Sequence, residues 1–313
     1  MLCYNSKEVI KIKLIYTVTQ EDLNLKSILR NKLKISNRLL IKLKMNHMIF
    51  VNDIPVSINY ELKENDIIEA RIDFIENDDI IPEKMNLDIL YEDEYLLAIN
   101  KAPSIVVHPS SYHPNGTIAN GVKYYLNNRR KIRPINRLDR DTSGVVMFAK
   151  NEYIQEQFVN LKVDKEYIAI VKGTPTTLAD TINAKISRKE GSIMERCVSE
   201  AGQVAITHYK VREEYENYSI LSVKIETGRT HQIRVHMAHI GHPILGDTLY
   251  GEESKLINRQ ALHSYKTSFV HPITGEEITV CADVPTDMSK FMCVSKFPKE
   301  TFPLTEKGEL PPA

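Results

Sequence analysis

Short β-rich runs separated by Gly, Pro and Asn turns occupy most of the chain from about residue 87 to residue 298. The clearest runs lie at 96–99, 144–148, 167–171 and 218–225, and helical periodicity is limited to 117–126 and 153–161. Strands that follow one another with few intervening helices pair mainly in the antiparallel sense. The predicted fold class is therefore α+β, built on a large, mostly antiparallel sheet.

The N-terminal region has a different charge pattern. Between residues 23 and 48 there are seven basic side chains and no acidic one. Leucines recur there at helical spacing, which predicts two short basic helices with Ser36 as the N-cap of the second. The pattern also predicts a hairpin at 48–56, a strand at 67–71 and an edge strand at 9–15.

The charges of the whole chain balance. Lys and Arg together number 41, as do Asp and Glu, so the formal net charge is zero. A polyanion could therefore bind only through a local basic patch. We expect the basic helices to form that patch, because a merely solvated face normally carries carboxylates as well. Its candidate contact residues are Lys26, Arg30, Arg38 and Lys42.

An acidic stretch with Pro82 divides the chain into two parts. We predict an N-terminal domain at 1–76, a linker at 77–86, a larger domain at 87–300 and a loose tail at 301–313. The four cysteines are scattered without a C-x-x-C pair, which is typical of reduced thiols. Neither a membrane span nor a signal peptide is evident, so we expect a cytoplasmic protein.

Two carboxylates and two arginines crowd the segment at 136–144 (NRLDRDTSG), just before a hydrophobic strand. Gly144 can supply the unusual backbone angles that such a turn needs. Most charge clusters of this kind are solvated ion pairs on exposed turns. Physical chemistry alone therefore favours an exposed turn over a functional site at this point.

Four histidines lie close together at positions 231, 236, 239 and 242. His236 and His239 would share one helix face, and Gly241 would end that helix. No cysteine lies nearby, and no carboxylate has the spacing of a zinc motif such as H-E-x-x-H. We therefore predict no metal site here. Tyr167, within the run at 167–171, is by itself typical of a core tyrosine.

The segment at 136–144 resembles the HRLDxxTSG signature of the RluA-type RNA pseudouridine synthases. Other segments are similar to motifs of that family in the family's order: 89–101, 106–109, 165–173, 228–236, 241–247 and 260–263. The resemblance covers about residues 87–285. The first 75 residues are similar to the S4-type RNA-binding domain of the large-subunit rRNA members. The resemblance thus implies a synthase domain preceded by a small S4-like α/β domain.

The resemblance also implies an activity, the isomerisation of uridine to pseudouridine in RNA without cofactor or metal. Asp139 matches the family's catalytic aspartate, either as nucleophile at C1′ or as base at C2′. Tyr167 matches the tyrosine that stacks on the uracil and accepts the C5 proton. Arg229 matches the arginine that pairs with the aspartate, and Leu262 the apolar wall of the uracil pocket.

Two positions beside the aspartate concern the RNA. Arg137 matches the arginine that fills the stack left by the flipped base, for which a planar guanidinium is suited. Asn136 stands where the family usually has His, and 100–104 reads NKAPS where NKPxG is usual. Because Asn136 can still donate and accept hydrogen bonds, we expect a tuned site and not an inactive one.

Other functions remain open from the sequence. The S4-like domain favours large-subunit rRNA as the partner over tRNA by family analogy alone. A non-catalytic RNA-binding or ribosome-assembly factor would keep the same fold. A metal hydrolase using the histidines is less favoured, as is a two-carboxylate glycosidase, because no second carboxylate has a motif of its own. We expect a monomer without membrane partners.

Overall fold

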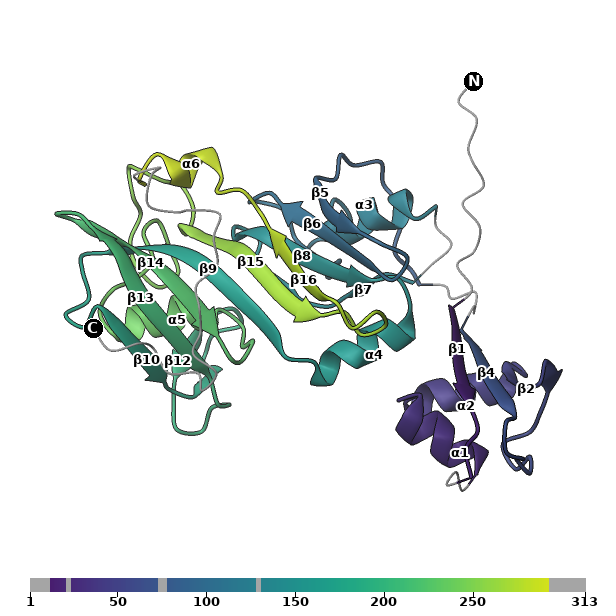
Figure 1. Ribbon diagram of the computed structural model, residues 1–313. Coiled ribbons are helices and arrows are strands. Elements are labelled where there is room, and N and C mark those ends of the chain that lie inside the picture. The colour runs from purple at the N-terminus through teal and green to yellow at the C-terminus, as the bar shows by residue number, and fades with distance from the viewer. Residues whose placement is uncertain (1–11, 21–23, 73–77, 128–130, 293–313) are drawn as a thin grey trace.

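The structure is a computed structural model that describes residues 12–20, 24–72, 78–127 and 131–292. Figure 1 shows a small N-terminal domain beside a larger domain built on one long, twisted sheet. Part of the predicted edge strand, residues 9–11, and the predicted tail at 301–313 lie outside the described residues.

The N-terminal domain packs helices on a four-stranded antiparallel sheet. In sheet order the strands are β1 (Ile12–Thr17), β4 (Ile67–Ile72), β2 (Ile49–Val51) and β3 (Ile54–Pro55). The helices are α1 (Leu25–Ser27), the π-helical η1 (Ile28–Lys32) and α2 (Asn37–Met45). The hydroxyl of Ser36 caps α2 by accepting from the amide of Leu39. Asn52 and Asp53 both have positive φ, as a tight hairpin turn requires, so the predicted hairpin and N-cap are confirmed.

The larger domain contains a ten-stranded sheet. Its main path is β10 (Ala179–Asn183), β13 (Ile206–Glu214), β14 (Tyr218–Ile225), β9 (Val163–Lys172), β15 (Leu262–Val270), β8 (Ser143–Ala149), β6 (Leu96–Lys101) and β5 (Ile89–Glu92). Strand β16 (Glu277–Cys281) pairs with β15, and β7 (Arg133–Pro134) pairs with β8. Strands β8 and β15 pair in parallel, and the other described pairs of this sheet are antiparallel. The predicted α+β class with a mostly antiparallel sheet is confirmed.

Short helices cover this sheet, and the first two of them begin at side-chain caps. They are α3 (Ile118–Tyr125), α4 (Glu152–Asn160), α5 (Gln232–His239) and α6 (Thr286–Ser289). Thr117 and Asn120 form a capping box at α3, and Asn151 caps α4. The helices predicted at 117–126 and 153–161 are thus confirmed. Within the described ranges, none is long and apolar enough to cross a bilayer.

The segment predicted as a loose linker is packed where the structure describes it. The Asp78 carboxylate accepts from the ammonium of Lys123 at 2.6 Å and from the amide of Ile132 at 2.7 Å. The Asn120 amide donates to the carbonyl of Ile81. Residues 78–86 therefore contact the larger domain through Asp78 and Ile81, and the bounds of the predicted linker and domains stay a prediction.

The two domains also contact each other through α2 and α4, which lie side by side in Figure 1. Glu152 on α4 forms ion pairs with Arg38 (3.2 Å) and Lys42 of α2, although its side chain is only 6% exposed. The Tyr153 hydroxyl donates to the carbonyl of Leu33 at 3.1 Å. One hydrophobic cluster includes buried side chains of both domains. The hydrophobic core is therefore continuous between the two domains.

Candidate active site

A cavity of about 910 Å³ opens beside the turn between β7 and β8. All six residues predicted for catalysis or uridine binding line it: Asn136, Arg137, Asp139, Tyr167, Arg229 and Leu262. They come from the turn, from β9 and β15, and from the loop before α5. The fold thus brings together side chains that are far apart in the sequence.

The turn that carries Asp139 is held by buried groups of other elements. The ammonium of Lys101 donates to the carbonyl of Arg140 at 2.8 Å, and the guanidinium of Arg259 donates to the carbonyl of Asp141 at 3.0 Å. Gly144 has φ of 110°, and a Cβ there would lie 2.1 Å from the carbonyl oxygen of Ser264. Only glycine fits this position, which fixes the turn against β15.

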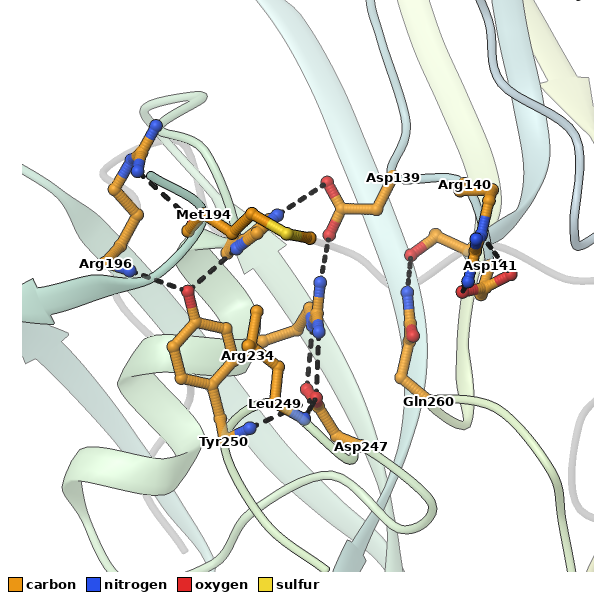
Figure 2. A network of polar contacts seen from close by, with 12 residues as sticks. Asp139, Arg140, Asp141, Met194, Arg196, Arg234, Asp247, Leu249, Tyr250 and Gln260 are labelled. Atoms are coloured by element: carbon orange, nitrogen blue, oxygen red, sulfur yellow. Dashed lines mark hydrogen bonds and ion pairs between the residues drawn. The ribbon is translucent and has the colours of Figure 1, made fainter. Parts of the chain in front are cut away.

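Asp139 is paired with an arginine on α5. The Nη1 of Arg234 donates to Oδ2 of Asp139 at 3.0 Å, while its Nε and Nη2 bind the two oxygens of Asp247 at 2.7 and 2.8 Å (Figure 2). Burial by itself would lower the pKa of Arg234, but hydrogen bonds and charge from Asp247 and Asp139 raise it above its ordinary value. Arg234 is therefore a fixed cation beside Asp139.

The predicted pairing of Arg229 with Asp139 is wrong. Arg229 is exposed in the loop before α5, and its Nε donates to the carbonyl of Val204 at 3.0 Å. Arg234, five residues later in the same motif, forms the pair with Asp139 that was expected of Arg229. The left-handed His231, with φ of 58°, is the N-cap of α5. The helix therefore begins after Arg229 and carries Arg234 within its first turn.

Tyr167 and Leu262 form an apolar side of the cavity. Tyr167 is 6% exposed and Leu262 is 4% exposed, and they belong to one hydrophobic cluster. Burial is the main reason that the pKa of Tyr167 is raised to about 12, and the charge of Asp139 adds to it. The phenol is thus neutral at physiological pH, which suits a surface for stacking a base.

Comparison with known proteins is consistent with this geometry. Residues 95–239 match the model of the RNA pseudouridylate synthase family, and residues 12–68 match that of the RluD ribosomal pseudouridine synthase N-terminal domain. A Bacillus subtilis protein named as the uncharacterized RNA pseudouridine synthase YjbO is 41% identical over 83% of this chain and 95% of its own length. This chain belongs to the RNA pseudouridine synthase family.

Two further relatives agree with that assignment. The ribosomal large subunit pseudouridine synthase D of Xylella fastidiosa is 37% identical over 68% of this chain and 71% of its own. The structure of human RNA pseudouridylate synthase domain containing 1 superimposes with a TM-score of 0.53 at 27% identity, covering 63% of this chain and 83% of that one. As a pseudouridine synthase, the chain is an isomerase acting on RNA. The matches also confirm the predicted RluA-type resemblance, whereas the S4-like character of the N-terminal domain stays a prediction.

His231 lies between Asp139 and Tyr250. Its Nε2 lies 3.9 Å from Oδ1 of Asp139, and its Nδ1 lies 2.7 Å from the hydroxyl of Tyr250. That hydroxyl also accepts from the amide of Arg196 at 2.8 Å (Figure 2). Burial is the main cause that lowers the pKa of His231. A neutral imidazole therefore faces the oxygen of Asp139 that Arg234 leaves open.

Other histidines of the cluster bind protein groups. His236 is fully buried between the Thr207 hydroxyl and the carbonyl of Ala184, and His242 contacts the carbonyl of Lys172. Among the residues that the structure describes, no group of three or more His, Cys, Asp or Glu side chains is arranged to hold a metal ion.

Asn136 and Arg137 differ in what their side chains contact. The Asn136 amide donates to the carbonyl of Val145 at 3.1 Å and accepts from the amide of Met147 at 2.7 Å. Asn136 therefore holds the turn against β8 through two hydrogen bonds. The sequence had predicted a contact with the RNA for this residue and not this structural role. Arg137 is exposed at the cavity, which is compatible with the predicted stacking position.

The predicted RNA contacts of the N-terminal domain divide into two groups. Lys26 is exposed, and Arg30 is partly exposed with one nitrogen bound to the carbonyl of Ile35. Arg38 and Lys42 instead pair with Glu152 of the synthase domain. These two residues are engaged by the protein itself, which the sequence pattern did not indicate.

Sequence reasoning missed Arg234, Asp247 and His231 as parts of the site. One signal was present for Arg234, since it lies between the apolar residues Ile233 and Val235. A charged side chain in such a segment needs a buried partner. Nothing local distinguishes Asp247, which meets Arg234 only in the folded chain.

Proposed function

We propose that this pseudouridine synthase acts on uridines of large-subunit ribosomal RNA. Relatives named as ribosomal large subunit pseudouridine synthase D support this choice, as does the match of residues 12–68 to the N-terminal domain of such an enzyme. The observation that carries the catalytic part of the proposal is Asp139, which lines the cavity with Oδ2 held by Arg234 and with Oδ1 3.9 Å from Nε2 of His231.

The isomerisation breaks the N1–C1′ bond and joins C5 of the same uracil to C1′. In our proposal, Oδ1 of Asp139 attacks C1′ or removes the proton at C2′, and Arg234 keeps the carboxylate oriented. A fixed cation of this kind offsets the cost of placing a carboxylate in a partly dry pocket. The uracil then turns and C5 bonds to C1′. In the first route this displaces the Asp139 carboxylate from C1′, and in the second C2′ regains its proton from Asp139. In both routes C5 then loses its proton and N1 gains one.

The aromatic and apolar side chains would hold the base during this turn. Tyr167 stacks on the uracil, and Leu262 limits its movement. A phenol with a pKa of about 12 is almost entirely protonated at neutral pH. It can therefore accept the C5 proton only through a small phenolate fraction, so that step would be slow at neutral pH and faster in alkali. Arg137 occupies the place of the flipped nucleotide.

The choice of ribosomal RNA as substrate has consequences for RNA binding, location in the cell and oligomeric state. Lys26 and its exposed basic neighbours on the N-terminal domain contact phosphates of the ribosomal RNA. We place this enzyme in the cytoplasm and expect it to act as a monomer, because residues of a single chain line the cavity. Transfer RNA is the alternative substrate.

Pseudouridine mapping tests the choice of RNA. Ribosomal and transfer RNA from cells lacking this protein should differ from wild type only at uridines of the large-subunit rRNA, and the purified enzyme should release tritium from 5-³H-uridine in that RNA. Loss of pseudouridine from tRNA alone would move the proposal to tRNA. No loss in either RNA, together with no tritium release, would favour a non-catalytic assembly factor.

A further inference from the structure

A small hairpin beside the active site carries an unfavourable pair of charges. Strands β11 (Ile186–Arg188) and β12 (Arg196–Val198) form a separate two-stranded ladder, in which Arg188 lies directly opposite Arg196. Like charges directly opposite each other destabilise a β-ladder. In the described part of the chain, the guanidinium of Arg188 has no ion-pair partner that would compensate for this repulsion.

A third arginine meets the same place. Arg229 lines a groove of about 350 Å³ together with Arg188 and Arg196, and no carboxylate is among the groove's lining residues. Gly202 forms part of its wall, where a Cβ would lie 2.5 Å from the backbone of Ile186. Three cations thus surround one hollow that contains no anionic side chain.

Two of the three guanidinium groups are held in place by backbone carbonyls. Arg196 donates through Nη1 to the carbonyls of Met194 and Glu195, at 3.2 and 3.0 Å (Figure 2 shows the contact with Met194). Arg229 donates through Nε to the carbonyl of Val204. Each keeps further N–H groups for a ligand, and little side-chain freedom is left to lose on binding.

The groove continues into the catalytic cavity. Gly228, Arg229 and Thr230 line both hollows. The backbone amide of Arg196 is tied to Tyr250, which also contacts His231 beside Asp139. A strand whose uridine lies at Asp139 would therefore reach the three arginines with an adjoining part of its backbone.

We propose that Arg188, Arg196 and Arg229 form a subsite for a backbone phosphate of the RNA next to the target uridine. Guanidinium groups bind phosphate oxygens in paired, charge-assisted hydrogen bonds. A bound phosphate would also offset the repulsion between Arg188 and Arg196. This inference rests on the proposed function in one respect, since it takes RNA as the ligand. It also gives Arg229 a role in substrate binding.

Salt dependence of RNA binding tests the subsite. The variants are Arg188→Gln, Arg196→Gln and Arg229→Gln, and the matched control is Lys189→Gln, which removes the same charge from the same hairpin outside the groove. Affinity for a stem-loop containing the target uridine is measured over a range of salt concentrations. Because the three arginines share one phosphate, each variant should reduce the magnitude of the slope of log K against log salt by at most about 0.7–0.9. Each should also raise KM more than it lowers kcat.

The outcomes are distinct. Slopes that match wild type, or an equal change in Lys189→Gln, would overturn the subsite. A loss confined to kcat would do the same, because it would place Arg229 in the chemistry. If wild type binds the stem-loop with the expected slopes but forms no pseudouridine in any rRNA, the subsite stands and the proposed function fails.

Inorganic phosphate gives a second, independent readout that does not depend on RNA. Phosphate should raise the melting temperature of wild type more than that of the double variant Arg188→Gln/Arg229→Gln, because phosphate stabilises the form that binds it. Equal shifts in both proteins would place the phosphate elsewhere and count against the subsite.

Discussion

The synthase cavity and the N-terminal helices both present positive charge, but in opposite physical settings. In the cavity one buried cation, Arg234, is held by three hydrogen bonds to two carboxylates. On the helices, lysines such as Lys26 and Lys44 are exposed and spread over a surface. Chemistry at one carbon atom needs a single geometry, whereas attraction of a polyanion needs only the number and density of charges.

The basic residues at the contact between the domains are intermediate between the buried Arg234 and the exposed lysines. The sequence pattern predicts Arg38 and Lys42 on the exposed basic face of the helices. In the structure they form ion pairs with Glu152, whose side chain is nearly buried. Lys42, whose side chain is 30% exposed, is partly covered by this contact, whereas Arg38 stays 72% exposed. The comparison therefore separates three uses of a basic side chain: orientation of a reacting group, docking and electrostatic attraction.

The largest expected effect comes from Asp139→Asn. The amide keeps the shape of the side chain but loses the oxygen charge needed to attack C1′ or remove a proton, so activity should fall by about 10²–10⁴-fold or more. RNA affinity should change little. The matched control is Asp141→Asn, since Asp141 is paired with Arg140 on the surface side of the turn. Tritium release from labelled RNA measures both, and a reversed order of activities would refute the assignment of Asp139.

Arg234→Ala should have the next largest effect, about 10²-fold or more on kcat. It removes the group that orients Asp139 and leaves the fully buried Asp247 without its partner. Arg229→Ala is the control within the same motif, and its effect should fall mainly on KM. The melting temperature of Arg234→Ala must be measured beside its kinetics, so that a loss of stability is not mistaken for a loss of catalysis. If Arg234→Lys restored stability and full activity, the need for a bidentate guanidinium would be wrong.

Replacement of Tyr167 should separate stacking from proton transfer. Tyr167→Phe keeps the ring and should slow turnover by about 10-fold or more, because it removes the phenol oxygen that accepts the C5 proton. Tyr167→Ala should lose base binding as well. If phenolate is the acceptor, the wild-type single-turnover rate should increase as the pH approaches the pKa of about 12. A flat alkaline profile in wild type would exclude this role.

Deletion of residues 1–76 should change both RNA binding and stability. Loss of the basic helices should flatten the salt dependence of rRNA affinity. The newly exposed Tyr153, and the loss of the two N-terminal ion pairs of Glu152, should lower the melting temperature. Activity on a short stem-loop should survive better than activity on full-length rRNA. The control Lys26→Gln/Lys44→Gln should change the salt slope without changing the melting temperature. Equal loss on both RNA substrates would mean that the domain supports the active site itself.

The smallest expected effect concerns stability in acid. His263 is fully buried between the Ser143 hydroxyl and the carbonyl of Ala282, and burial lowers its pKa to about 4. His263 becomes protonated near pH 6.5 in the unfolded chain, whereas in the folded chain it becomes protonated only near pH 4. The stability that neutral His263 contributes is therefore present above about pH 6.5 and is lost as the pH falls toward 4.

A melting curve at each pH between 8 and 4 measures this effect. His263→Gln should be less stable than wild type at pH 8, because its hydrogen bonds are altered, but its melting temperature should fall less as the pH decreases. Parallel pH dependence in the two proteins would show that other groups govern acid sensitivity.

Local signals in the sequence were sufficient for several elements. The hairpin of β2 and β3 follows from Asn52 and Asp53, and the start of α2 follows from Ser36, because turns and caps are decided by hydrogen bonds within three or four residues. The turn at Asp139 was located in the same way, with Gly144 in the conformation that it alone tolerates. These features need no knowledge of distant segments.

The choice between Arg229 and Arg234 was decided by tertiary structure. Both belong to one short motif, but only Arg234 lies in α5, where it meets Asp247 on one side and Asp139 from the far side of the cavity. Packing of residues 78–86 and the docking of α2 on α4 were decided in the same way. The sequence by itself determined the strands, caps, turn and family motifs, since each acts over a few residues. Which charges are paired depended on distances between residues 13 to 110 positions apart, and those distances exist only after folding.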